Sequence, residues 1–203
     1  MAWGIQVSRR SPTLNVGRLR NRISIVRVSP VQDSMGGTNL SADVLYANVW
    51  ASVEALSGQD KFAAHEFVSE VSHQVVIRYI AAAPSWLANT QYLAGALVVD
   101  DNGDLEQAQS GGGLSGASAP DWSELLGGLT EDGDPSTGIT WKNLGPAPTR
   151  TGVTAQMQVW FNGRQFQIQA VQNPDERTKM LLLQCIEIND SKQQTLSGGT
   201  ILG

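Results

Sequence analysis

The chain has 203 residues, and 41% of them are hydrophobic, which is enough to build a core in one large domain or two small ones. Its formal net charge of −5 argues against a dedicated nucleic-acid binder, because such proteins usually present a basic face. The single cysteine excludes an internal disulfide framework, and no segment approaches the roughly 18 apolar residues that a membrane-spanning helix needs.

Composition changes sharply in the middle of the chain. Residues 84–146 hold eleven of the 21 glycines and three of the six tryptophans, and nine acidic residues against Lys142 give this stretch a net charge of −8. The other 140 residues carry 13 basic and 10 acidic groups, a net charge of +3. Such a break usually marks an insertion or a second domain. We therefore predict an inserted Gly/Trp-rich acidic β module over 84–146, a discontinuous scaffold of residues 1–80 and 153–190, and a C-terminal tail over 191–203.

The N-terminal end is locally basic. All six charged residues before Asp33 are arginines, namely Arg9, Arg10, Arg18, Arg20, Arg22 and Arg27. With no acid in this stretch, they lack local acidic partners. They form either a solvated or subunit-contacting face, which we favour, or a set of phosphate contacts.

The first elements of the scaffold are strands around a long loop. Residues 22–28 (RISIVRV) are β-branched and partly alternating, which predicts a strand. Residues 29–43 contain Pro30, Gly36 and Gly37 and are expected to form a long loop or flap. Residues 44–55 return to a strand pattern, with Tyr46, Trp50 and Val53 as expected core positions.

A short helix and a third strand follow. Ser57 is placed as an N-cap with Asp60 three residues later, and apolar residues recur at helical spacing through 60–70, which predicts one short helix. Residues 71–80 alternate and predict a strand that places Val75, Ile77 and His73 on one face.

After the central stretch comes the clearest local signal of the chain. Asn162-Gly163 separates two alternating segments, TAQMQVWF and RQFQIQAV, which predicts a β-hairpin with a type I′ turn. Residues 180–188 (MLLLQCIEI) form a last strand, apolar on both faces. We expect Trp50, Ile77, Phe166, Ile168 and Leu182 to be buried. The fold class is therefore mainly β: a small antiparallel β-barrel or sandwich with one short helix, plus an inserted small β module.

Residues typical of catalysis or cofactor binding are sparse. Neither His65 nor His73 has a cysteine or carboxylate partner at metal-ligand spacing, and the glycine-rich segment 111–116 lacks the lysine of a phosphate loop. Segment 128–138 contains acids near a turn but lacks the regular ladder of a calcium loop. Cys185 lies in an apolar run and is expected to be a buried small hydrophobe. We expect no enzymatic activity, no cofactor and no metal.

Aromatic residues of the central stretch admit two interpretations. Trp86, Tyr92, Trp122 and Trp141 could form a stacking platform for a sugar, and they could equally be the core of a small glycine-rich module. We favour the core.

The order of several scaffold motifs resembles that of bacteriophage head–tail adaptor proteins, also called head-closure or stopper proteins. These motifs are G-R-L-R-N-R-I at 17–23, D-S-M-G-G at 33–37, V-W-A-S-V-E-A-L-S-G at 49–58, V-S-H-Q-V-V-I-R-Y at 71–79 and F-N-G-R-Q-F-Q-I-Q-A-V-Q-N-P-D-E-R at 161–177. The central stretch resembles a Trp/Gly-rich module of phage structural proteins, with Pro120-Asp121-Trp122 and Trp141-Lys142-Asn143-Leu144-Gly145 among its matching positions. Compact members of the family lack such an insertion.

The resemblance implies a structural protein of the virion neck, assembled in the bacterial cytoplasm. It implies a cyclic homo-oligomeric ring, six- or twelve-fold, with portal and adaptor proteins above, tail-terminator or tail proteins below, and packaged double-stranded DNA in the channel without sequence-specific contact. The long loop then falls in the position of a lumen-facing gate, with the gate residues Val31, Gln32, Asp33, Ser34, Met35, Gly36, Gly37 and Leu40. Arg18, Arg20, Arg22 and Arg78 are the candidates for contacts within the ring or with the adaptor.

Two other classes of function remain open from the sequence. One is a virion accessory protein whose inserted module binds carbohydrate through the four aromatic residues. The other is a nucleic-acid-binding small barrel that uses the N-terminal arginines with Tyr79 or Trp160 as stacking groups.

Overall fold

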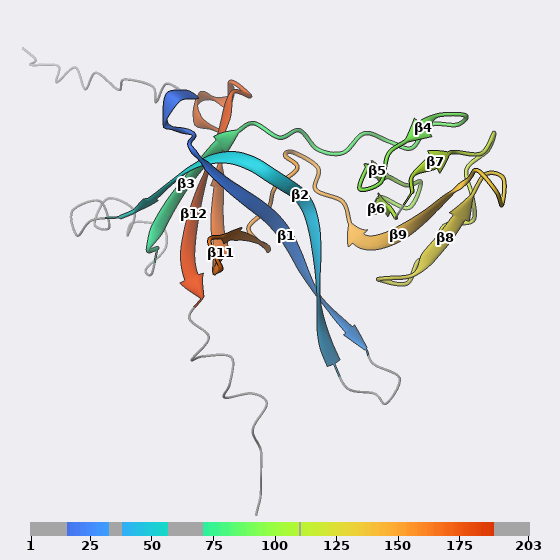
Figure 1. The fold of residues 1–203 in the computed structure, drawn as a ribbon, viewed down its shortest axis with the longest axis horizontal. Helices are drawn as coiled ribbons and strands as arrows, with labels where there is room; N and C mark the ends of the chain where they lie inside the picture. Colours follow the sequence, from blue (N-terminus) through green and yellow to red (C-terminus); the bar gives the residue numbers. More distant parts are fainter. Residues whose placement is uncertain (1–15, 33–37, 57–70, 110, 189–203) are drawn as a thin grey trace, which may run out of the picture.

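The computed structural model describes residues 16–32, 38–56, 71–109 and 111–188 (Figure 1). Six antiparallel strands from the two outer parts of the chain close on themselves as a barrel, in the order β1–β10–β11–β12–β3–β2, and β2 pairs again with β1. They are β1 (Asn21–Gln32), β2 (Thr38–Ala55), β3 (His73–Arg78), β10 (Met157–Phe161), β11 (Arg164–Gln172) and β12 (Met180–Ile188). The mainly β class predicted from the sequence is confirmed.

The barrel core follows the predicted alternation on most strands. Val75 and Ile77 of β3, and Phe166 and Ile168 of β11, are at most 1% exposed, because alternate residues of a strand face the same side. Asn162 and Gly163 have φ values of 49° and 73°, as a type I′ turn requires, and they join β10 to β11.

Two expected core residues face outward instead. Trp50 is 47% exposed, and its neighbour Ala51 is buried instead. The cause is a bulge in β2, which has one more residue than β1 between the pairs Ile23–Val49 and Ile25–Tyr46. Such a bulge reverses the facing of the residues beyond it, and Asn48, inside it, has a φ of 56°. Leu182 of β12 lies on the outer face, since its neighbours Leu181 and Leu183 take the inner one.

The predicted long loop over 29–43 is wrong for most of its length. β1 continues to Gln32 and β2 starts at Thr38, so that residues 28–32 pair with residues 38–42 in a two-stranded arm. Pro30 is tolerated there because an edge strand of a ribbon need not donate on both sides. The 3-10 turns η1 (Val16–Arg18) and η2 (Pro174–Glu176) lie at one end of the barrel, and the arm projects from the other end (Figure 1).

Some expectations fall outside the described residues. The helix predicted over 60–70 and the tail over 191–203 are among these, as are gate residues 33–37. Within the described part of the chain, no helix is long and apolar enough to cross a membrane.

The central stretch folds into two small antiparallel sheets. β4 (Gln91–Tyr92) pairs with β7 (Gly113–Leu114), and a four-stranded sheet has the order β5–β6–β9–β8. Its strands are β5 (Leu97–Val99), β6 (Asp104–Ala108), β9 (Ile139–Pro146) and β8 (Leu129–Asp132). Pro146 is the last residue of β9. A small hydrophobic cluster fills this part of the chain, formed by Val98, Ala108, Trp122, Ile139 and Trp141.

The insertion packs against the barrel where the arm begins. Leu105 and Leu144 of the insertion belong to the same hydrophobic cluster as the barrel core. The Lys142 ammonium group pairs with Asp43, and the Gln107 side-chain amide donates to the Val44 carbonyl at 2.9 Å. Arg27 of β1 donates to the Pro146 carbonyl at 3.2 Å. We call this contact region the arm root.

Candidate interaction surfaces

Polar side chains that could do chemistry are occupied by structural contacts. The His73 Nδ1 atom lies 2.9 Å from Ser72 Oγ, its Nε2 atom lies 3.2 Å from an Arg164 nitrogen, and its ring meets Phe166 edge to face. Burial raises the pKa of the Cys185 thiol to about 12, so this side chain stays protonated at neutral pH. Among the described residues, no group of three or more His, Cys, Asp or Glu side chains is arranged to hold a metal ion.

Strand pairing gathers arginines at one end of the barrel. Four strands meet at this end: the start of β1 pairs with the last part of β2, which pairs with the end of β3, which pairs with the start of β12. The pairs are Arg22–Trp50, Ala51–Ile77 and Arg78–Met180. Exposed basic side chains therefore line this end, which we call the basic rim: Arg18, Arg20, Arg22, Arg78 and Lys179. The structure thus brings together all four arginines that the sequence suggested as an interface.

Three of the N-terminal arginines have hydrogen-bond partners in the fold, although no acid lies near them in the sequence. Arg18 pairs with Glu54 at 2.8 Å, and the Arg20 Nε atom donates to the Gly17 carbonyl at 2.8 Å. Arg22 donates to the Asn48 carbonyl, and its guanidinium lies 3.6 Å from the centre of the Trp50 ring. Glu54 and the two carbonyl groups belong to residues 17–54, and Glu54 is far from Arg18 in the sequence. The absence of acids before Asp33 therefore does not predict whether these arginines have partners in the fold. Only the Arg18 contact is with an acid, so the other two keep their net positive charge.

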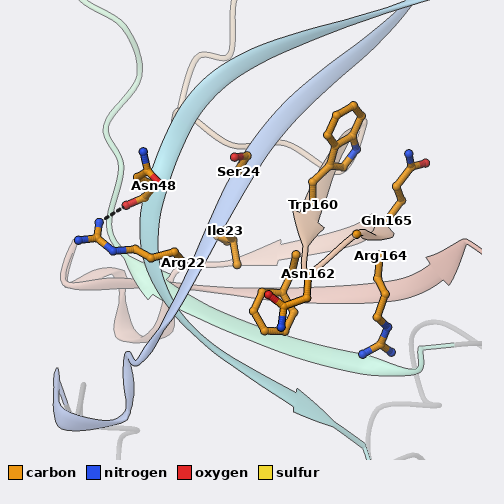
Figure 2. Close-up of a pocket in the computed structure, with 10 residues that line it drawn as sticks. Arg22, Ile23, Ser24, Asn48, Trp160, Asn162, Arg164 and Gln165 are labelled. Atoms are coloured by element: carbon orange, nitrogen blue, oxygen red, sulfur yellow. Dashed lines mark hydrogen bonds between the residues drawn. The ribbon is translucent and has the colours of Figure 1, made fainter.

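A groove lies beside this rim (Figure 2). It has a volume of about 460 Å³ and is bordered by Arg22 and Asn48 on one side and by Trp160, Asn162 and Arg164 on the other. Arg164 is bound to both carboxylate oxygens of Glu187 at 2.6 Å, and this hydrogen bonding holds the pKa of Glu187 below its usual value. Arg164 is therefore already neutralised, and Arg22 supplies the net charge of the groove.

Three of the predicted gate residues, Val31, Gln32 and Leu40, lie in the described arm. Val31 pairs with Asn39, and Gln32 pairs with Thr38, at the far end of the described ribbon. The Leu40 side chain is 65% exposed on this ribbon. Asp33, Ser34, Met35, Gly36 and Gly37 lie outside the described residues. The arm is therefore a projecting, partly apolar ribbon.

The four aromatic residues of the insertion pack on one another. Trp141 is fully buried and meets Tyr92 and Trp122 edge to face, with ring centres 5.1 and 6.1 Å apart. The indole nitrogens of Trp86 and Trp141 donate to the same Asp132 Oδ2 atom at 2.8 and 3.0 Å. The rings are used as a core, and this arrangement gives no support to an open sugar-stacking platform.

Two features were missed by reasoning from the sequence. One is the exposed Trp50 under Arg22, which only the bulge in β2 reveals. The other is Glu106, which is fully buried in β6 although a glutamate in an acidic stretch suggests a solvated residue. Neither of its carboxylate oxygens has a hydrogen-bond partner within the described structure.

Comparison with known proteins finds one family. The family model described as phage head completion protein matches residues 14–96, which include β1, the arm, β2, β3 and the start of the insertion. No curated protein matches the chain. The match confirms the resemblance to phage head-closure proteins and supports a structural role at the head of the virion, in contact with other head or tail proteins.

Proposed function

We propose that this chain is a head-closure, or stopper, protein of the virion neck, which joins the portal and adaptor complex to the tail and helps to retain packaged DNA through its arm. The observation that carries the proposal is the match of residues 14–96 to phage head completion proteins. The matched region includes the whole arm and the arginines of β1. The role is structural, with no enzymatic step and no cofactor.

The chain has the parts that such a ring needs. A closed barrel is a rigid unit without free edges, whereas the arm leaves it as a ribbon of two strands. A lone ribbon buries little apolar surface, and it gains order when copies meet. We propose six or twelve copies around a channel, joined by head-to-tail interfaces that close a ring. The arms point into the channel and meet the DNA without reading its sequence.

We further propose the division into a discontinuous scaffold of residues 1–80 and 153–190, an inserted module over 84–146 and a tail over 191–203. The separate hydrophobic cluster around Trp141 supports the module as a unit. The arm root ties it to the scaffold through Leu105, Leu144 and Lys142. The neck lies in the virion and is assembled in the host cytoplasm, between the portal side above and tail proteins below.

The arm can be tested by shortening it. Deleting residues 32–38 removes the connection between β1 and β2, whereas replacing the same seven residues with Gly and Ser keeps the length and removes the larger side chains. We expect both variants to assemble into necks, and the deletion to release DNA from filled, tailless heads. DNA inside the heads is quantified after nuclease treatment, with wild-type protein as the reference. Equal retention in all three samples would reject the gating role and leave the arm as a contact for the adaptor or the tail.

A further inference from the structure

We propose that the basic rim of one copy binds segment 121–131 of the insertion of a second copy. This interface rests on the proposed function only in assuming that copies of the chain meet. Two different surfaces of the chain form this interface, and charged and apolar side chains of both join them.

The rim carries an exposed aromatic–arginine pair. Trp50 is 47% exposed, and the Arg22 guanidinium is held against its ring by the stack and by the Asn48 carbonyl. Tryptophan and arginine are the residues that most often dominate the energy of protein interfaces, especially when they are held rigidly in advance. An indole ring of this size on the outer face of a barrel, beside a groove, therefore marks a contact surface.

Positive charge at the rim is only partly offset among the described residues: Glu54 pairs with Arg18, and Asp175 and Glu176 of η2 lie at the same end. Arg20 and Arg22 bind backbone carbonyls, which leave their formal charge intact. Arg78 and Lys179 are exposed neighbours on β3 and next to the start of β12. Such a surface favours an acidic partner, and arginine suits a carboxylate because its planar fork can donate two hydrogen bonds.

Segment 121–131 supplies the complementary chemistry. Asp121, Glu124 and Glu131 are exposed in it, interleaved with three exposed leucines. Leu125 is 75% exposed, Leu129 is 62% exposed and Leu126 is 40% exposed. Clustered exposed leucines next to carboxylates form a surface that can cover an aromatic ring and neutralise arginines at the same time.

The two surfaces of one copy lie apart. The insertion contacts its own barrel at the arm root, through Lys142 with Asp43 and Arg27 with Pro146. Figure 1 shows the insertion to one side of the barrel, away from η1 and η2, which mark the end where the rim lies. The segment of a second copy is therefore the acidic occupant that this sequence offers. Contacts between two different patches of identical chains are head-to-tail, and they continue until a ring closes or a filament grows.

The experiment uses two single variants of the full chain, Arg22→Glu and Glu124→Lys, in analytical ultracentrifugation. Each keeps one surface intact and reverses the other, so each alone should lose self-association by roughly tenfold or more. When the two are mixed, the intact rim of the Glu124→Lys copy meets the intact segment of the Arg22→Glu copy. We expect association to return, first as a 1:1 dimer through this intact pair and as larger assemblies where the two reversed surfaces, which are again opposite in charge, also meet.

Matched variants test whether the effect is specific. Asp101→Lys makes the same type of charge change at an exposed acid of the insertion outside the segment, and it should assemble like wild type. Trp50→Ala should weaken assembly while unfolding at nearly the wild-type temperature, because the ring lies on the outer face. Circular dichroism of every variant checks that loss of assembly is not loss of the barrel.

Three results would overturn the interface. They are a wild-type chain that stays monomeric at all concentrations, a mixture of the two variants that stays monomeric, and an equal loss of assembly in Asp101→Lys. Binding of duplex DNA that Arg22→Glu weakens, in a monomeric wild-type protein, would instead assign the rim to phosphate contacts. None of these results touches the proposed neck function, which depends on finding the protein in necks on isolated particles.

Discussion

The carboxyl group of Glu106 offers a quantitative test of the inserted module. It is fully buried in β6, and the Asn143 amide opposite it donates to Asp104 Oδ2 at 3.0 Å and to the Ser123 carbonyl at 2.8 Å. Asn143 lowers the pKa of Glu106, but this effect is smaller than those that raise it. Burial, reinforced by the negative charges of Asp100 and Asp104, raises the pKa of Glu106 from 4.5 to about 8. The folded protein therefore holds a proton on this group at neutral pH.

This shift makes stability fall as the pH rises. Below pH 4.5 the group is protonated in both the folded and the unfolded chain, so it costs nothing. Between pH 4.5 and about 8 only the unfolded chain releases the proton, so the free energy of unfolding drops by about 1.4 kcal/mol per pH unit. Above pH 8 the loss levels off. At pH 7 the accumulated cost is about 3 kcal/mol.

Replacing Glu106 with Gln keeps the position uncharged at every pH. We therefore expect Glu106→Gln to be more stable than wild type by up to about 3 kcal/mol at pH 7 and to match it near pH 4. Urea unfolding at a series of pH values, followed by tryptophan fluorescence, measures this, since three of the six tryptophans lie in 84–146. Glu124→Gln removes an exposed carboxylate from the same module and serves as the control.

The decisive quantity is the difference between the two pH profiles. We expect the difference between Glu106→Gln and wild type to grow from pH 5 to pH 8, while the difference for Glu124→Gln stays flat. Parallel profiles for wild type and Glu106→Gln would show that Glu106 is ionised in the folded protein. The carboxylate would then be hydrated or paired, and the argument from burial would be wrong.

Three further predictions concern the scaffold and its junction with the insertion. Phe166→Ala should lower the free energy of unfolding by roughly 3–5 kcal/mol in urea titrations, because the ring is fully buried; a change near zero would contradict the barrel register. Gly163→Ala should cost about 1–2 kcal/mol in the same assay, since a Cβ there meets no atom within 4 Å and only the positive φ of 73° is penalised; no loss would mean that the turn relaxes. Replacing residues 84–146 with a short Gly/Ser linker should leave a folded but less stable barrel, because Leu105 and Leu144 leave its core, and loss of cooperative unfolding would show that the barrel cannot fold without the insertion.

The six scaffold strands could be predicted because their signals are local. Alternation along β3, β10 and β11 places apolar residues on one face, and Asn162-Gly163 fixes the turn between two of these strands. Closure of the sheet follows from pairing each strand on both sides, which a mainly antiparallel fold of this size favours.

Errors in the sequence analysis arose where the regular repeat is interrupted. The extra residues of β2 opposite Ile23 and Ile25 turn Trp50 outward, and no pattern of apolar residues shows where a bulge falls. In β12 every residue from 180 to 183 is apolar, so alternation could not choose between Leu182 and its neighbours. Pro30 and the two glycines suggested a loop, but cross-strand pairing extended the ribbon to Gln32.

The candidate interface was predicted in part. Arg18, Arg20 and Arg22 were selected as charges without local acids. Strand pairing places Arg22 and Arg78 at one end of the barrel, and Arg18 and Arg20 directly precede β1 there. Their contacts could not be derived, because Glu54 and the Asn48 carbonyl reach them across β2 and not along the chain. Whether these residues join copies of the protein remains a prediction that the variants at Arg22 and Glu124 will test.

The composition break at residue 84 predicted an inserted module, and the contacts at the arm root tie that module to the scaffold. The side-chain contacts with Asp43, Val44 and Arg27 all fall where β1 and β2 leave the barrel, next to the last pair of β1 with β10, Arg27–Met157. A two-stranded ribbon bends most easily where it loses its neighbouring strands. Contacts placed there restrict the direction of the arm more than the same contacts would elsewhere. The insertion therefore contacts the scaffold at the base of the arm, where such contacts bear most on the direction of the arm.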